Sequence, residues 1–246
     1  MTLEKLIPAL LLAILLPYGS ANADCTLCWM AHQGDLDRVR SMIADGADVN
    51  GGDEINTTAL HFAASSGHLD VARLLLREGA SVDALYEHGY SPLINAAFGG
   101  HLEVANLLIE AGADINHTTS LGLTALHYAA LGGHAAVVSS LLDAGAEFAS
   151  QPRDGFSALH RAANNGHTDV AILLIAAGSD LNVRDRFGAT PLHFAAERGR
   201  ADMIILLLES GADARVMTRD LRTPLDLASE PVLSTAAGEA LRAASH

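Results

Sequence analysis

Histidine dominates the chemically capable residues of this sequence, with 12 among 246 residues. Imidazole can bind metals or transfer protons near neutral pH. Eight histidines recur at multiples of 33 residues, in two sets: His61, His127, His160 and His193, then His68, His101, His134 and His167. Members of one set would lie a helix spacing apart, about 8–10 Å, whereas zinc holds nitrogen ligands at about 2.1 Å. We therefore expect no metal site and no cofactor. Because no nucleophile or phosphate-loop motif is present either, we expect no catalytic residue.

The two cysteines form the other chemically capable motif, Cys25-Thr26-Leu27-Cys28. At a helix start such a pair can act as a redox dithiol, because the helix terminus lowers a thiol pKa. The preceding strand and βαβ pattern of thioredoxin-like enzymes are missing, and a zinc site would need two more cysteines. We favour a local disulfide that staples the first helix, with free thiols and redox activity as the alternatives.

A repeated unit positions all of these residues. One hydroxyl residue and one glycine return at every 33rd position: Thr58, Ser91, Thr124, Ser157, Thr190 and Thr223, and Gly46, Gly79, Gly112, Gly145, Gly178 and Gly211. Thr or Ser before a helix accepts a hydrogen bond from a free backbone N–H, and Pro92, Pro191 and Pro224 suit the first helical position. A Gly-His pair then separates two helices, and the glycine column ends the second helix.

The motif Thr190-Pro191-Leu192-His193-Phe194-Ala195-Ala196 and its four counterparts, which start at Thr58, Ser91, Thr124 and Ser157, resemble the ankyrin-repeat family. The resemblance covers nearly all of the chain after residue 23. It implies an all-α repeat solenoid of stacked helix–turn–helix units with short β-hairpin fingers. It also implies that the histidine of the motif is a framework residue that forms hydrogen bonds between repeats.

The phase of the motif divides the chain into a leader and seven units. A degenerate N-terminal capping repeat comes first, because shifting Thr58 back by one period gives Cys25, and a unit that loses the motif histidine at Asp226 comes last. The expected segments are a signal peptide over 1–23, the N-terminal cap over 24–52, repeats over 53–85, 86–118, 119–151, 152–184 and 185–217, and a C-terminal cap and tail over 218–246.

The first 23 residues have the layout of a secretory signal: a short charged start, the apolar run from Leu6 to Leu16, and the small-residue site Ala21-Asn22-Ala23. We expect export to the bacterial periplasm or the extracellular space, and a mature form that is not embedded in a membrane. An uncleaved anchor and lipidation at Cys25 are the alternatives. The formal net charge of −14 argues against a nucleic-acid partner.

Function is expected on the side chains that do not repeat. The resemblance places partner binding on the concave face, formed by the fingers and the first helices. An apolar patch is predicted there with a basic patch beside it. The predicted partner-binding residues are Tyr90, Phe98, Leu121, Leu123, Leu131, Phe156, Arg184, Arg186, Phe187, Arg198, Arg219 and Arg222. We expect Tyr90→Ala with Leu123→Ala to abolish binding without changing the melting temperature. Phe156 and Phe187 have an alternative role in closing gaps between fingers.

We therefore interpret the chain as a monomeric, non-catalytic protein that binds an unknown protein partner, with no small-molecule substrate. One alternative is an exported effector or inhibitor that uses the same face. Another is a thiol-redox accessory factor that uses Cys25 and Cys28.

Overall fold

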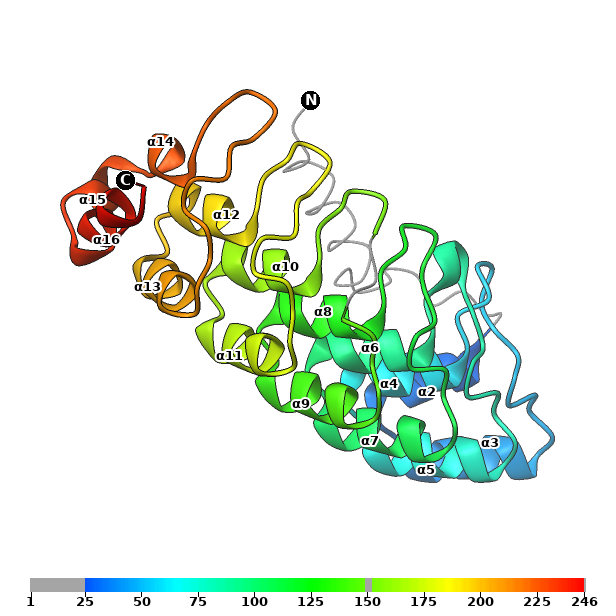
Figure 1. The fold of residues 1–246 in the computed structure, drawn as a ribbon. Coiled ribbons are helices and arrows are strands. Elements are labelled where there is room, and N and C mark those ends of the chain that lie inside the picture. Colours follow the sequence, from blue (N-terminus) through cyan, green and yellow to red (C-terminus); the bar gives the residue numbers. More distant parts are fainter. Residues whose placement is uncertain (1–24, 149–151, 246) are drawn as a thin grey trace.

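The computed structural model describes residues 25–148 and 152–245. Helices stack in two layers along a curved array, and loops called fingers project from one edge (Figure 1). The predicted leader over 1–23 lies outside the described residues. Within those residues, no helix has the length and apolar character needed to cross a membrane.

Each unit contributes one helix to each layer. The first helices are α2 (Thr26–Gln33), α4 (Ala59–Ser66), α6 (Pro92–Gly99), α8 (Ala125–Gly132), α10 (Ala158–Asn165) and α12 (Pro191–Glu197). The second helices are α3 (Leu36–Ala44), α5 (Leu69–Arg77), α7 (Leu102–Glu110), α9 (Ala135–Asp143), α11 (Thr168–Ala176) and α13 (Ala201–Glu209). The chain ends with α14 (Pro224–Leu227), α15 (Glu230–Leu233) and α16 (Ala236–Ala244), the last of which packs against α13.

The hydroxyl column forms the N-caps of the first helices, as the spacing predicts. Ser157 Oγ accepts a hydrogen bond of 3.3 Å from the His160 backbone N–H, and Ser91 Oγ does the same for Ile94. In the first unit a sulfur replaces the hydroxyl, and Cys25 Sγ accepts from the Cys28 backbone N–H. These contacts satisfy N–H groups that a helix start leaves without a partner.

A continuous apolar core runs between the layers. The leucine of each motif is almost fully buried, and so are both alanines that follow the histidine. The small alanine side chains allow neighbouring first helices to approach closely, while larger residues of the second helices, such as Leu75 and Leu108, fill the remaining space. The repeated residues are therefore the residues that hold the stack together.

The fingers are loops and not the β-hairpins that we expected. Among the described residues only two isolated bridges occur, Gly52 with Thr58 and Tyr86 with Tyr90. Each finger instead closes one tight turn, such as the 2.8 Å hydrogen bond from the Gly122 N–H to the Thr119 carbonyl oxygen. One backbone hydrogen bond then links each finger to the preceding one, so no ladder long enough for a strand pair forms.

Candidate protein-binding surface

The motif histidines are buried and belong to the framework. His61 Nδ1 accepts from the Thr58 N–H at 3.2 Å, and its Nε2 donates to the carbonyl oxygens of Ala84 and Tyr90 at 3.0 and 3.2 Å. His160 and His193 bind the finger that follows them in the same way, at 3.1 Å. Each of these three rings thus ties a helix start to the next finger. Burial lowers the pKa of His61 and of His160 to about 4, so both rings are neutral near pH 7.

The second histidine column connects consecutive units. The Nε2 of each ring donates to a backbone carbonyl oxygen in the first helix of the preceding unit. The distances are 2.9 Å for His68, 3.0 Å for His101 and 2.9 Å for His134. Arg200 takes this position in the last regular unit and donates through Nε to the Asn164 carbonyl oxygen. Within residues 25–148 and 152–245, no three His, Cys, Asp or Glu side chains are grouped so that they could share a metal ion.

The two cysteines are joined as a disulfide at the start of α2, with Cα atoms 5.2 Å apart. Cys28 is only 3% exposed, and its sulfur lies 3.3 Å from the Thr57 carbonyl oxygen. Exchange needs only one accessible sulfur, and Cys25 is half-buried, so the burial of Cys28 does not decide between the staple and the redox alternative. That this disulfide staples the first helix stays a prediction.

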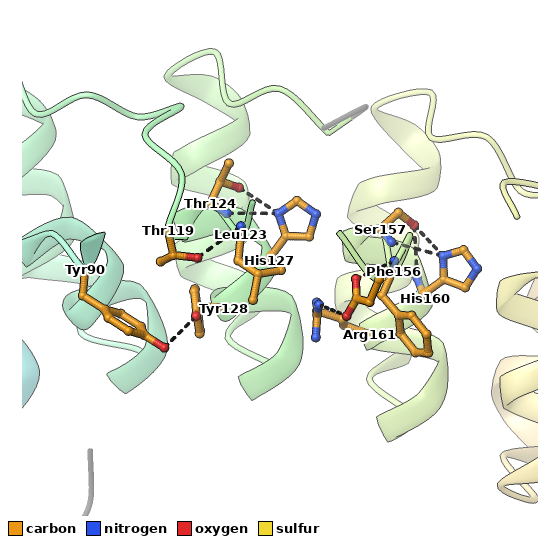
Figure 2. Close-up of polar contacts among 11 residues, drawn as sticks. Tyr90, Thr119, Leu123, Thr124, His127, Tyr128, Phe156, Ser157, His160 and Arg161 are labelled. Atoms are coloured by element: carbon orange, nitrogen blue, oxygen red, sulfur yellow. Dashed lines mark hydrogen bonds and ion pairs between the residues drawn. The ribbon is translucent and has the colours of Figure 1, made fainter. Parts of the chain in front are cut away.

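Two residues of the predicted apolar patch are not available on the surface. Tyr90 is 5% exposed and Leu123 is 7% exposed, because both precede a helix cap and pack beneath the finger onto the helix layer. Tyr128 of α8 donates its hydroxyl to the Tyr90 hydroxyl at 3.0 Å (Figure 2). Burial raises the pKa of both phenols. The expectation that Tyr90 and Leu123 are free contact residues is therefore wrong, since they are part of the core.

Phe156 also fills space between units. Its ring centroid lies 4.6 Å from that of Phe194 in the next first helix and 5.5 Å from that of His160. The guanidinium of Arg161 lies over the same ring, 5.8 Å from its centroid, and pairs with Asp154 at 3.1 Å (Figure 2). This cluster supports the gap-closing interpretation of Phe156.

The other predicted apolar residues remain accessible to different extents. Phe98 and Leu131 are half-buried at the ends of their first helices. Leu121 and Phe187 are exposed at the tips of two fingers, and Phe187 is 53% exposed. Four predicted apolar side chains therefore remain at least partly accessible, and one of them, Phe98, also packs against the ring of Tyr128 with 6.0 Å between ring centroids.

The predicted arginines lie together on the last two fingers and the adjacent helix end. Arg184 donates to the carbonyl oxygens of Gly188 and Met217, and Arg198 donates through Nε to Asn164 Oδ1 at 3.1 Å. Arg186 lies over the ring of Phe187, 4.7 Å from its centroid. Arg219 and Arg222 are exposed. Arg184 is consequently occupied in linking two fingers, while the side chains of Arg186, Arg219 and Arg222 face solvent.

Exposed apolar side chains that were not predicted from the sequence include Trp29 and Leu221. Trp29 of α2 is 43% exposed and lies one period before Phe62, so the 33-residue phase could have placed it on the same face. Leu221 is 76% exposed with a φ of 60°. It occupies a position that is glycine in four of the five earlier fingers. The sequence itself shows that leucine replaces glycine at this finger position.

Comparisons with known proteins agree with this architecture. Models of ankyrin repeats match residues 27–119, 116–185 and 174–228. The chain is also similar to the crystal structure of the human ASB11 ankyrin repeat domain, with a TM-score of 0.82 and 28% identity over 90% of this chain and 98% of that one. No curated protein matches. Arrays of this kind generally mediate protein–protein interactions and are typically non-catalytic. With most of its length matched, the chain belongs to the ankyrin-repeat family.

Proposed function

We propose that this chain is an exported, non-catalytic scaffold that holds a partner protein against its fingers and the adjoining ends of its first helices. One observation carries the proposal. The side chains that repeat, from the cap hydroxyls to the paired alanines, are buried in contacts that hold the stack together. Apolar and basic residues that differ between units are exposed at the finger tips. Large exposed apolar side chains beside arginines are typical anchors of protein interfaces.

The basic end of this surface contrasts with the rest of the molecule. The protein has a formal net charge of −14, yet Arg186, Arg219 and Arg222 are exposed together on the last two fingers. A local positive field on an acidic protein favours approach of an acidic partner surface and disfavours other orientations. The proposal therefore places the partner's acidic residues against the C-terminal fingers.

Site-specific photocrosslinking in the native compartment tests which face is used. A photoreactive residue at position 187 on a finger should crosslink a partner protein, and one at position 172 on α11 should not. Phe187 and Ile172 make a matched pair because each is apolar and 53% exposed. Equal crosslinking at both positions, or crosslinking only at 172, would contradict the proposed face.

Export is part of the proposal and needs a separate test. The apolar run and small-residue site within residues 1–23 support it. Cell fractionation combined with the intact mass of the purified protein should show a chain outside the cytoplasm that begins at Asp24. A cytoplasmic protein that retains residues 1–23 would overturn this part while leaving the binding face to be judged by the crosslinks.

A further inference from the structure

The fingers hold one exposed side chain per unit in fixed register. The backbone N–H of Arg219 donates to the Phe187 carbonyl oxygen at 2.8 Å, and that of Ser120 donates to the His88 carbonyl oxygen at 2.8 Å. The same bond, from one finger to the one before it, joins Glu87 to Ile55 and Arg153 to Leu121. Because the donor residue occupies the same place in every turn, the side chains of these residues form a row along the finger tips.

We call these side chains the tip row. Its members, from the first finger to the last, are Glu54, Glu87, Ser120, Arg153, Arg186 and Arg219. All six are exposed. The row is acidic at its N-terminal end, neutral at Ser120 and basic at its C-terminal end. The backbone hydrogen bonds that fix the row do not depend on its side chains, two of which also contact a neighbour in their own finger, Glu87 with His88 and Arg186 with Phe187.

The charges of the tip row are complementary to those of a second, identical row that runs in the opposite direction. When two identical rows lie antiparallel, the first finger of one faces the last finger of the other, which opposes Glu54 to Arg219 and Glu87 to Arg186. Ser120 then faces Arg153 near the two-fold axis. The spacing matches automatically, because both copies have the same period. An isologous two-fold interface requires this kind of self-complementary surface.

We infer that two copies of this chain associate through antiparallel tip rows. Ion pairs between exposed side chains contribute little individually, about 0.2–1 kcal/mol, so the row chiefly sets orientation and register. The exposed apolar side chains on the same tips, Leu121, Phe187 and Leu221, supply surface to bury. The inference departs from the monomer expected from the sequence. A second copy would occupy the same finger tips as the proposed partner protein, so the dimer and the partner complex compete for this surface.

The charged groups around the row support this pairing. Asp154 adjoins Arg153 but is bound to Arg161 at 3.1 Å, so its charge is compensated within its own unit. Arg222 adds a second positive charge on the last finger, opposite the first finger of the other copy. Asp220 is the exposed carboxylate that opposes the pattern, beside Arg219. The basic end therefore keeps an excess of positive charge.

Charge reversal with mixing tests the inference on the purified exported protein by sedimentation equilibrium. The parent should show twice the chain mass at high concentration. The variants Arg186→Glu with Arg219→Glu, and Glu54→Arg with Glu87→Arg, should each associate about tenfold more weakly or not at all, because like charges then face each other. An equimolar mixture of the two variants should recover the dimer, since every reversed position then meets its opposite.

The control reverses two exposed arginines of α5, Arg73→Glu with Arg77→Glu, which changes net charge equally but lies off the tip row. This control should dimerise like the parent, and in its mixture with the Glu54→Arg and Glu87→Arg variant only the control should be found in dimers. A parent that stays monomeric overturns the inference. So does equal weakening in the control, or a mixture of the two tip-row variants that remains monomeric while circular dichroism shows both folded. A crosslink from position 187 to a second copy gives twice the chain mass and supports the dimer, whereas a crosslink to a different protein supports the proposed partner, so the two proposals are judged separately.

Discussion

The Nε2 of His167 donates a hydrogen bond of 3.2 Å to the carbonyl oxygen of Leu131 in the preceding unit. The ring reaches that oxygen by passing over Gly133, where a Cβ would lie 2.5 Å from His167 Nδ1. Gly133 also has a φ of +76°, in the left-handed region. The glycine therefore meets two requirements at once, a left-handed helix end and room for the next unit's histidine.

We expect Gly133→Ala to lower the free energy of unfolding by about 2–3 kcal/mol, since it adds backbone strain and displaces the ring from its hydrogen bond. Gly112→Ala is the matched control. Gly112 has a similar φ of +88°, but a Cβ there would meet nothing within 4 Å. Strain alone should cost about 1 kcal/mol. Urea denaturation of both variants measures the difference, and equal losses would show that the ring is not constrained by the glycine.

Stability should fall as the pH drops from 7 to 5. The folded pKa of His160 is about 4, below the value of 6.5 for an exposed ring, so unfolding takes up a proton in this range. The stability that depends on the neutral ring is present above pH 6.5 and declines as the pH falls toward 4. This one group should account for about 2 kcal/mol of the loss between pH 7 and pH 5.

Urea denaturation at both pH values, for the parent and for His160→Gln, isolates that contribution. The variant is less stable at pH 7, but its loss on acidification should be smaller by about 2 kcal/mol. Gly112→Ala provides the comparison, because it is destabilised without the loss of a titratable group. The loss on acidification in that variant should match that of the parent. A His160→Gln variant with undiminished pH sensitivity would contradict the assignment of a buried neutral ring.

The structure agrees with the sequence-based prediction for residues whose structural role depends only on neighbours within one repeat. The cap at Ser157 and the left-handed turn at Gly112 depend on neighbours a few residues away, and the period identifies them in every unit. Tyr90 differs because its environment is set by Tyr128 of the following unit, where other units have Phe62 or Arg161. A residue whose burial depends on a nonrepeating neighbour cannot be placed from the period alone.

The exposure of Arg222 also could not be predicted from the period alone. Arg222 occupies the position that buries Tyr90, Leu123 and Ala189 in earlier fingers, yet it is exposed. Within the described residues, the chain continues from Arg222 into the short helix α14 and then α15 and α16, which leave it exposed. The β-hairpin fingers were implied by the family resemblance, and they do not form because each short finger closes with too few backbone hydrogen bonds for a strand pair.

The double variant Tyr90→Ala with Leu123→Ala should destabilise the fold, contrary to our expectation from the sequence. Each substitution empties a buried volume, and the first also leaves the Tyr128 hydroxyl without the acceptor that it has at 3.0 Å. Truncations of this size typically cost about 2–5 kcal/mol each. Differential scanning calorimetry should show a clear fall in melting temperature. An unchanged melting temperature would indicate that both residues are surface contacts and not part of the core.

Reduction of the disulfide should have only a small effect. The bond between Cys25 and Cys28 closes a loop of a few residues, for which the chain-entropy model gives at most about 2 kcal/mol. Intact mass of protein isolated without reductant should show both thiols oxidised, and adding reductant should increase hydrogen exchange in α2 while leaving α6 unchanged. A mass with two free thiols would rule out the staple.

Leu221 offers a test in which a substitution should increase stability. The same turn closes each finger, and the residue whose N–H closes it has a positive φ every time, as in Gly188 at 81° and Leu221 at 60°. A leucine in this conformation is strained by about 1–2 kcal/mol, partly offset by the lower entropy cost of ordering it compared with glycine. We expect Leu221→Gly to raise the free energy of unfolding by about 0.5–1 kcal/mol.

Leu221→Ala removes the same exposed apolar surface but keeps the strain, so it should give no gain. If both variants were equally stabilised, exposure of the leucine and not its backbone conformation would be the source of the cost. A gain confined to glycine would mean that the native chain retains a strained apolar tip, as expected for a side chain kept for contact with another surface.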